Sequence, residues 1–342
     1  MPNQRSKCRR GDPRNVPLTY AGVTDRRRFL VAEEGKYLLD TLPADIGAAL
    51  TKSFLETGLD SPEKEILLRH LLQHSTITQM VKESSTSSLT FEYLYRKKPV
   101  DNEIDAYFPR GKATVGIFER LVSLKENLPG IIRREMQERR INGRKFQILN
   151  VGSGPGHDTI EMLAENHDLV ERVHVICLDP DKEALDIGRK RAMQLDLTRS
   201  ITFVDKGLQE YGPASGADMI LMIGLLCPMP NEACHKILKN SRVFARHDGL
   251  VLFSTVQRPM VEDDPLTDFI MRVAGWRMHY KEDHEPDEIA RMAGWRPIDR
   301  FHDRLGYNCM TVAKLERDWR NTVRRALHPL YRTFKRVTTR PR

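Results

Sequence analysis

The feature that most constrains the fold is an alternation of short apolar runs with helical patterns, which begins at residue 146. The apolar runs lie at residues 146–151, 173–178, 201–204, 219–223 and 250–256. Segments with helical periodicity lie between several of them, at 158–166, 181–194 and 231–246. Strands that alternate with helices are typical of a parallel sheet with helices on both faces. This part of the chain is therefore predicted to have an α/β fold.

The last two apolar runs, 296–301 and 309–315, are connected differently. The short link between them contains Leu305-Gly306-Tyr307-Asn308 and has no room for a helix. Strands joined by so short a link pair antiparallel, because a parallel connection needs a crossover of about a dozen residues or more. We therefore predict a seven-stranded, mostly parallel sheet with an antiparallel terminal hairpin at its edge.

Helical patterns, and no convincing strand pattern, precede residue 145. Ser61-Pro62-Glu63-Lys64 is a helix start, in which Ser61 is a capping residue and Pro62 fits the first turn. A long amphipathic stretch runs from Val115 to Met136. We expect four parts: a basic flexible N-terminus at 1–28, a helical cap at 29–140, the sheet domain at 141–316 and a basic tail at 317–342.

The net charge of +8 resides at the two ends of the chain. Residues 317–342 carry nine Lys or Arg and one acid, and residues 1–28 carry eight Lys or Arg and two acids. The stretch between them is therefore net acidic. The basic composition describes the ends alone and does not imply a basic catalytic groove.

Three alternate glycines follow the first apolar run, in Val151-Gly152-Ser153-Gly154-Pro155-Gly156-His157. Ligands bind at the carboxyl ends of parallel strands, and glycines let a ligand approach the backbone closely. Because residue 157 is His, the loop lacks the Gly-x-Gly-x-x-Gly of dinucleotide-binding proteins, and no Gly-Lys-Ser/Thr of a phosphate loop follows. We expect a ligand here; a tight strand–helix turn without a ligand is the alternative.

Two acids end the next two strands. Asp179 follows 173–178, where a carboxylate can accept two hydrogen bonds from a ribose diol. Asp205 ends 201–204 and is placed to accept from an exocyclic adenine amine. Helix capping is the alternative for Asp179, and a solvated loop position is the alternative for Asp205.

Residues 146–256 resemble the class I S-adenosylmethionine (SAM)-dependent methyltransferase family. Asn150–Gly156 is similar to its first motif, Asp179 to its acidic second motif, Asp205 to its adenine-side acid, and 217–226 to its fourth-strand motif. The resemblance implies a seven-stranded sheet, SAM over the glycine loop and the ribose on Asp179. Asn150 stands where the family commonly has an acid, which leaves the contact with the methionine amino group to water or backbone. The cofactor-binding residues expected are Asn150, Gly152, Ser153, Gly154, Gly156, Asp158, Asp179, Pro180, Asp205, Ile223 and Gly224.

The function expected first is in-line methyl transfer from SAM to a small-molecule substrate. Such a transfer depends on alignment more than on acid–base chemistry. The helical cap would lie over the carboxyl edge of the sheet, close the pocket and exclude water. Tyr107, His302 and Tyr307 are the catalytic candidates, chosen by position, and Arg110 is a further candidate for contact with the methionine end or the substrate.

Three alternatives stay open. SAM itself can be the substrate of a cyclisation or aminobutyl transfer that releases methylthioadenosine, as in azetidine-2-carboxylate and nicotianamine synthases. An RNA methyltransferase would use the basic ends as phosphate contacts, and a lipid methyltransferase would use the tail at a membrane surface. As a helix, the tail would have an apolar stripe and a basic face, which could bind a membrane surface, a partner or RNA phosphates, or pack against the acidic body of the chain. Its apolar stripe comprises Trp319, Val323, Leu327, Leu330, Tyr331 and Phe334.

Several other chemistries lack their residue patterns. Cys227-Pro228 reverses the Pro-Cys of cytosine-5 methyltransferases, and no Asn/Asp-Pro-Pro-Tyr motif occurs. His279, His284 and His302 match no metal-ligand spacing, so we expect no metal site. The five cysteines are scattered and no apolar stretch follows the basic N-terminus, which predicts a cytoplasmic protein without disulfides.

Overall fold

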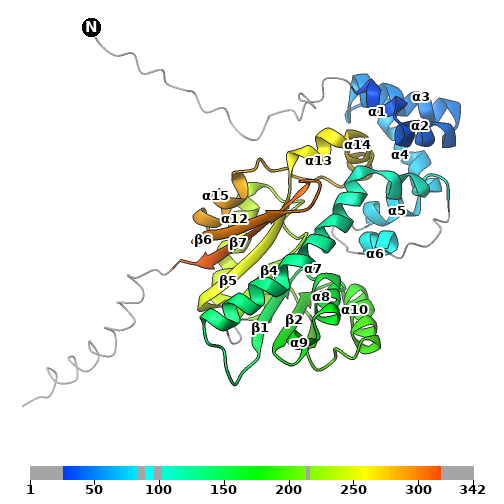
Figure 1. Cartoon of the computed structure of the whole chain (residues 1–342). Helices are drawn as coiled ribbons and strands as arrows, with labels where there is room; N and C mark the ends of the chain where they lie inside the picture. The colour runs from blue at the N-terminus through cyan, green and yellow to red at the C-terminus, as the bar shows by residue number, and fades with distance from the viewer. Residues whose placement is uncertain (1–25, 84–88, 96–101, 213–215, 317–342) are drawn as a thin grey trace, which may run out of the picture.

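The structure of the chain is a computed structural model that describes residues 26–83, 89–95, 102–212 and 216–316. A helical cap lies at one end of a seven-stranded sheet that carries helices on both faces (Figure 1). The cap is built from α1 (Arg27–Val31), α2 (Glu33–Thr41), α3 (Ala44–Lys52), the π-helical turn η1 (Ser53–Thr57), α4 (Pro62–His74), α5 (Thr76–Glu83), α6 (Leu89–Tyr95), the 3-10 turn η2 (Asp105–Arg110) and the long helix α7 (Lys112–Glu138).

The sheet has the strand order β3-β2-β1-β4-β5-β7-β6. Its strands are β1 (Phe146–Val151), β2 (Val173–Asp179), β3 (Ile201–Asp205), β4 (Ala217–Met222), β5 (Ala245–Val256), β6 (Trp295–His302) and β7 (Asn308–Leu315). The first five strands pair parallel, and β7 pairs antiparallel with both β5 and β6. The predicted mixed sheet with an antiparallel terminal hairpin is therefore confirmed.

The remaining helices connect the strands. They are α8 (His157–Glu165), α9 (His167–Val170), α10 (Lys182–Gln194), α11 (Leu208–Tyr211), α12 (Asn231–Ser241), the 3-10 turn η3 (Arg242–Phe244), α13 (Arg258–Asp263), α14 (Pro265–Ala274) and α15 (Glu285–Met292). Among the described residues, no helix is both long and apolar enough to cross a membrane.

Helices cover both faces of the sheet, and successive side chains of a strand point to opposite faces. On one face, Ile148 and Met219 pack against apolar residues of α7 such as Leu128. On the other face, Ile220 packs with Leu238 of α12. Burial on both faces explains why these strands appear in the sequence as continuous apolar runs.

The core of the cap includes a helix from the sheet domain. Leu50, Phe54 and Leu67 of the cap pack with Phe269 and Ile270 of α14. The hydroxyl groups of Tyr107 and Thr267 lie 3.0 Å apart, and the backbone N–H of Ala113 donates to Asp264 at 3.0 Å. These contacts fix the cap on the carboxyl side of the sheet.

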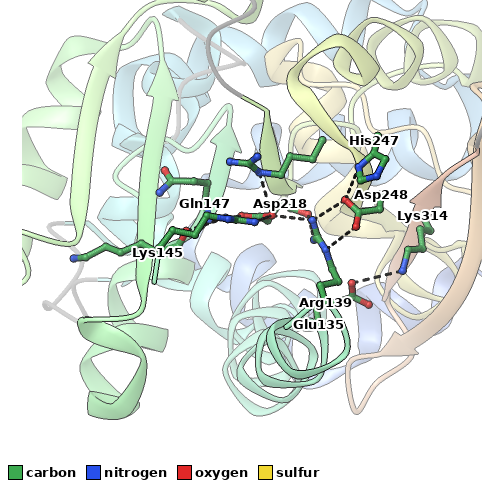
Figure 2. A network of polar contacts seen from close by, with 10 residues as sticks. Glu135, Arg139, Lys145, Gln147, Asp218, His247, Asp248 and Lys314 are labelled. Atoms are coloured by element: carbon green, nitrogen blue, oxygen red, sulfur yellow. Dashed lines mark hydrogen bonds and ion pairs between the residues drawn. The ribbon is translucent and has the colours of Figure 1, made fainter. Parts of the chain in front are cut away.

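A buried network holds the C-terminal end of α7 near the amino ends of the parallel strands (Figure 2). Asp218, which has no exposed surface, accepts from Arg139 at 2.8 Å, from Arg144 at 2.5 Å and from the backbone N–H of Gln147 at 2.9 Å. Arg139 also donates to Asp248. Burial alone would raise the pKa of Asp218, but these hydrogen bonds and charges outweigh it and lower the pKa. The network therefore connects the C-terminal end of α7 with strands β1, β4 and β5.

Two of the expected parts fall largely or wholly outside the described residues. Residues 1–25 of the basic N-terminus and the whole basic tail, 317–342, are among the residues not described. The interactions expected of the tail, with a membrane, nucleic acid or the body of the chain, therefore remain predictions.

Candidate cofactor and substrate site

The glycine loop turns sharply at the carboxyl end of β1. Gly152, Gly154 and Gly156 all have positive φ, at 63°, 51° and 75°. A Cβ atom on Gly156 would lie 2.9 Å from the sulfur of Cys177 in β2, so the loop presses against the neighbouring strand. Residues with side chains rarely adopt this conformation, which explains the glycines. The turn leaves backbone atoms facing the end of the sheet.

Asp179 lies beside this loop. Its carboxylate accepts from the backbone N–H groups of Gly154 and Asp181, both at 2.8 Å. The capping alternative is wrong, because α10 is capped by Asp181, which accepts from the backbone N–H of Ala184 at 3.1 Å. Desolvation raises the pKa of Asp179. Each carboxylate oxygen can accept a further hydrogen bond, so Asp179 is fixed and still able to bind a ligand.

A second acid lies at the start of α8. Asp158 accepts from the side-chain amide of Asn150 at 3.1 Å and from the backbone N–H of Thr159 at 3.0 Å. Burial raises the pKa of Asp158, and those hydrogen bonds and the charge of Arg120 lower it in part. Arg120 comes from α7, and its guanidinium lies against Gly224, 3.3 Å from where a Cβ would be. The two opposite charges flank the glycine loop.

A cavity lies between the glycine loop and the cap. Its floor includes Gly152–Pro155, Asp158 and Asp179. Its walls are mostly apolar and come from both the cap and the sheet domain. The apolar side chains are Ile77, Leu94, Phe108, Ile117, Leu121, Ile223, Leu225, Met229, Val256, Met260, Met271, Trp276, Met278 and Tyr280.

Two buried polar pairs also face this cavity. Glu92 of α6 pairs with His157, which directly follows the glycine loop, and so links the cap to the floor. Asp268 of α14 pairs with Arg272 at 2.6 Å and accepts from the hydroxyl of Tyr280 at 2.7 Å. The sequence interpretation missed Glu92, Arg120 and Asp268 as site residues. Asp264-Pro265 is a helix-start signal that could have located α14, whereas no local signal marks Glu92.

Most of the predicted cofactor residues lie together. Gly152, Ser153, Gly154, Asp158, Asp179, Ile223 and Gly224 line the cavity. Asn150 is 1% exposed and contacts Asp158, and Gly156 is buried behind the loop. Pro180 lines an adjoining groove with Lys206, Gly207 and Leu208. Asp205 is exposed at the end of β3 and pairs in register with Asp179.

The three catalytic candidates lie outside the lining of the cavity. Tyr107 is buried beside Thr267, and desolvation raises its pKa well above the usual value. Tyr307 donates to Asp263 at 2.7 Å, and desolvation together with that hydrogen bond raises its pKa. His302 lies 3.3 Å from Asp283 near the end of β6. Tyr107 and Tyr307 thus have hydrogen-bond partners elsewhere in the fold, and the structure does not bring the three candidates together at the cavity.

Two further expectations concern sulfur and metals. Cys227 lines the cavity, but burial raises the pKa of its thiol, which disfavours the thiolate that a nucleophile requires. In the part of the chain that the structure describes, no group of three His, Cys, Asp or Glu side chains could hold a metal ion.

Comparisons with known proteins identify the domain that carries the glycine loop. A family model described as a methyltransferase domain matches residues 148–249, from β1 into β5. The resemblance to the class I SAM-dependent methyltransferases seen in the motifs is therefore confirmed over this domain, and a methyltransferase domain implies SAM as its cofactor.

Solved structures share the fold of this chain. A possible exported protein from Bordetella parapertussis is 15% identical, with a TM-score of 0.58, and the match covers 83% of this chain and 97% of that one. Magnesium protoporphyrin IX methyltransferase from Synechocystis PCC 6803, with bound S-adenosylhomocysteine, is 15% identical with a TM-score of 0.50, covering 70% and 99%. At these identities the likeness concerns the fold alone. A search of curated protein sequences gave no match.

Proposed function

We propose that this chain transfers a methyl group from SAM, in line, to a small and mostly apolar molecule held under the cap. The observation that supports this most is a single cavity whose floor is the glycine loop and whose walls come from the cap. Its apolar and aromatic side chains suit a compact organic substrate. A duplex nucleic acid would need an open basic surface instead, and Arg120 is set among Glu92, Asp158, Asp179 and Asp268.

The residues around the loop suit the methionine end of SAM, which carries an ammonium and a carboxylate. Asp158 would accept from the ammonium, and Arg120 would donate to the carboxylate. Asn150 would act through Asp158, which its side-chain amide holds. The side-chain oxygen of Asn150 is buried and has no hydrogen-bond partner among the described residues, so it offers a further acceptor at this end. Opposite charges at one end of a site match a zwitterion.

The adenosyl end would lie toward β2 and β3. Asp179, fixed by Gly154 and Asp181, would accept from the ribose hydroxyls. The adenine would extend toward Pro180 and the loop of Lys206, Gly207 and Leu208, because the groove they line shares Gly152 and Leu225 with the lining of the cavity. Asp205, at the end of the next strand, would accept from the adenine amine.

SAM supplies a methyl group on a positively charged sulfur, which is already electrophilic. The chain would contribute alignment of the acceptor and exclusion of water rather than acid–base steps. The cap side chains Ile77, Leu94 and Phe108 would cover the acceptor. In this proposal, residues 29–140 act as the cap, with α14 completing its core, and residues 141–316 act as the SAM-binding domain.

We further propose that the chain works in the cytoplasm. Cys177, Cys227, Cys234 and Cys309 are all buried and form no disulfide. Such unpaired thiols are typical of proteins kept in a reducing compartment.

Product analysis tests the proposal. The purified full-length chain is incubated with methyl-deuterated SAM and a fractionated small-molecule extract, and the nucleoside products are measured by mass spectrometry. Methyl transfer yields S-adenosylhomocysteine and a deuterated acceptor. Methylthioadenosine as the sole product would show instead that SAM is the substrate of a cyclisation or aminobutyl transfer. A deuterated RNA or lipid would contradict the small-molecule assignment.

A further inference from the structure

One connection of the sheet lacks a full-length helix. The crossover from β2 to β3 carries the 13-residue α10, and that from β4 to β5 carries the 11-residue α12. The crossover from β3 to β4 contains only the four-residue α11 in its described part. On this face of the sheet a groove is left between α11 and α12.

The groove runs along the direction of the strands, from the carboxyl ends of the parallel strands to their amino ends. At the carboxyl edge it is lined by Gly152 and Leu178, and at the opposite edge by Ala245 and Leu315. Leu208, Ile237 and Phe244 add apolar surface along its length. Val243 also lines it and is 66% exposed, which is unusual for a valine beside a sheet face.

The described chain ends in this groove. Leu315 and Glu316, the last two described residues, both line it. A further 26 residues follow, and Trp319, Val323 and Leu327 repeat at a spacing of four, which places them on one face of a helix. We propose that residues 317–328 form a helix that lies in the groove with this apolar face against the sheet.

The lengths agree with this proposal. Pro329 ends a helix that begins at Arg317, so at most 12 residues are available. At 1.5 Å per residue this helix would span about 18 Å. A six-residue strand such as β4 spans about 20 Å at roughly 3.3 Å per residue. The tail helix would therefore reach from Glu316 to the carboxyl edge of the sheet.

Charge distinguishes this docking from binding to a polyanion. The groove carries Lys206, Lys239, Arg242 and His247 against Glu210 and Glu316, and the tail is itself basic. Apolar contact must therefore hold the helix, and salt should strengthen the docking by screening the like charges. Binding of the same tail to RNA or an anionic membrane weakens as salt rises.

The test uses the full-length chain labelled with 5-fluorotryptophan. Its three tryptophans, Trp276, Trp295 and Trp319, give three fluorine signals, and Trp319→Phe assigns the tail signal. Exposure is measured by the broadening that a dissolved paramagnetic agent causes, without SAM, at low and high salt. The variant Val243→Lys places a charge in the groove. Its control is Met292→Lys, because Met292 is 71% exposed on α15 and does not line the groove.

The expected result is that Trp319 is shielded several-fold relative to a synthetic peptide of residues 317–342. The shielding should persist or increase at high salt, be lost in Val243→Lys and be kept in Met292→Lys. Trp319 broadened as strongly as in the peptide, or shielded only after anionic vesicles or RNA are added, would overturn the proposal.

Discussion

Replacing Asp158 with Asn tests how the methionine end of SAM is held. The substitution keeps the shape of the side chain and an oxygen that can accept from Asn150 and from the backbone N–H of Thr159. It removes the negative charge. The fold around α8 should therefore be preserved, and the loss should fall on the contact with the ammonium group.

The magnitude follows from the kind of contact that is removed. A hydrogen bond to a charged group contributes about 1.5–3 kcal/mol, which corresponds to a loss of about 10- to 150-fold in affinity. The loss should depend on pH in the wild type. Burial raises the pKa of Asp158, and an ammonium favours its ionised form, so the affinity for SAM is full above the raised pKa and falls as the pH drops through it. Asp158→Asn should lack this dependence.

Calorimetry compares SAM with 5′-methylthioadenosine, which lacks the methionine amino acid. Asp158→Asn should weaken binding of SAM and leave binding of methylthioadenosine unchanged. Glu161→Gln is the matched control, since Glu161 lies on the same helix and pairs with Arg191 at the surface. An equal loss for both ligands, or no loss for SAM, would refute the assignment of Asp158 to the ammonium.

Three substitutions test other parts of the account. Asp218→Asn should cost about 3–5 kcal/mol in urea unfolding, because it removes the buried charge that pairs with Arg139 and Arg144, and an unaffected stability would contradict the buried network. Since the pKa of Asp218 is lowered, its contribution is lost only as the pH falls through that lowered value. Gly156→Ala should cost at least about 1–2 kcal/mol in thermal unfolding from its left-handed backbone, and an unchanged midpoint would show that the loop relaxes. Tyr307→Phe should cost about 1 kcal/mol and keep methyl transfer within a few-fold, whereas lost transfer at full stability would restore Tyr307 as a catalytic residue.

The sheet domain was predictable because its signals are local. Strands such as β1 and β4 are buried on both faces and so appear as apolar runs, and the short link at Leu305–Asn308 dictates the antiparallel hairpin. The helices α13 and α14 escaped prediction, although Asp264 and Pro265 mark the start of α14. Their apolar residues belong to clusters formed with distant parts of the chain, since α14 packs with the cap and Met260 of α13 packs with Tyr307.

The site was predictable only where one segment carries it. The glycine loop and Asp179 lie within or directly after strands that the sequence reveals. Glu92, Arg120 and Asp268 reach the cavity from three separate helices, and their positions depend on how the cap packs. Tyr107, chosen for its place in the chain, faces the core of the cap instead, because Thr267 of α14 gives its hydroxyl a partner there.

A crystal structure of the chain with S-adenosylhomocysteine tests the central claim most directly. The account predicts the nucleoside over Gly152–Gly156, with its ribose hydroxyls on Asp179, its amino acid between Asp158 and Arg120, and its sulfur facing the apolar cavity under the cap. Density for the nucleoside elsewhere, or a sulfur that faces away from the cap, would contradict it.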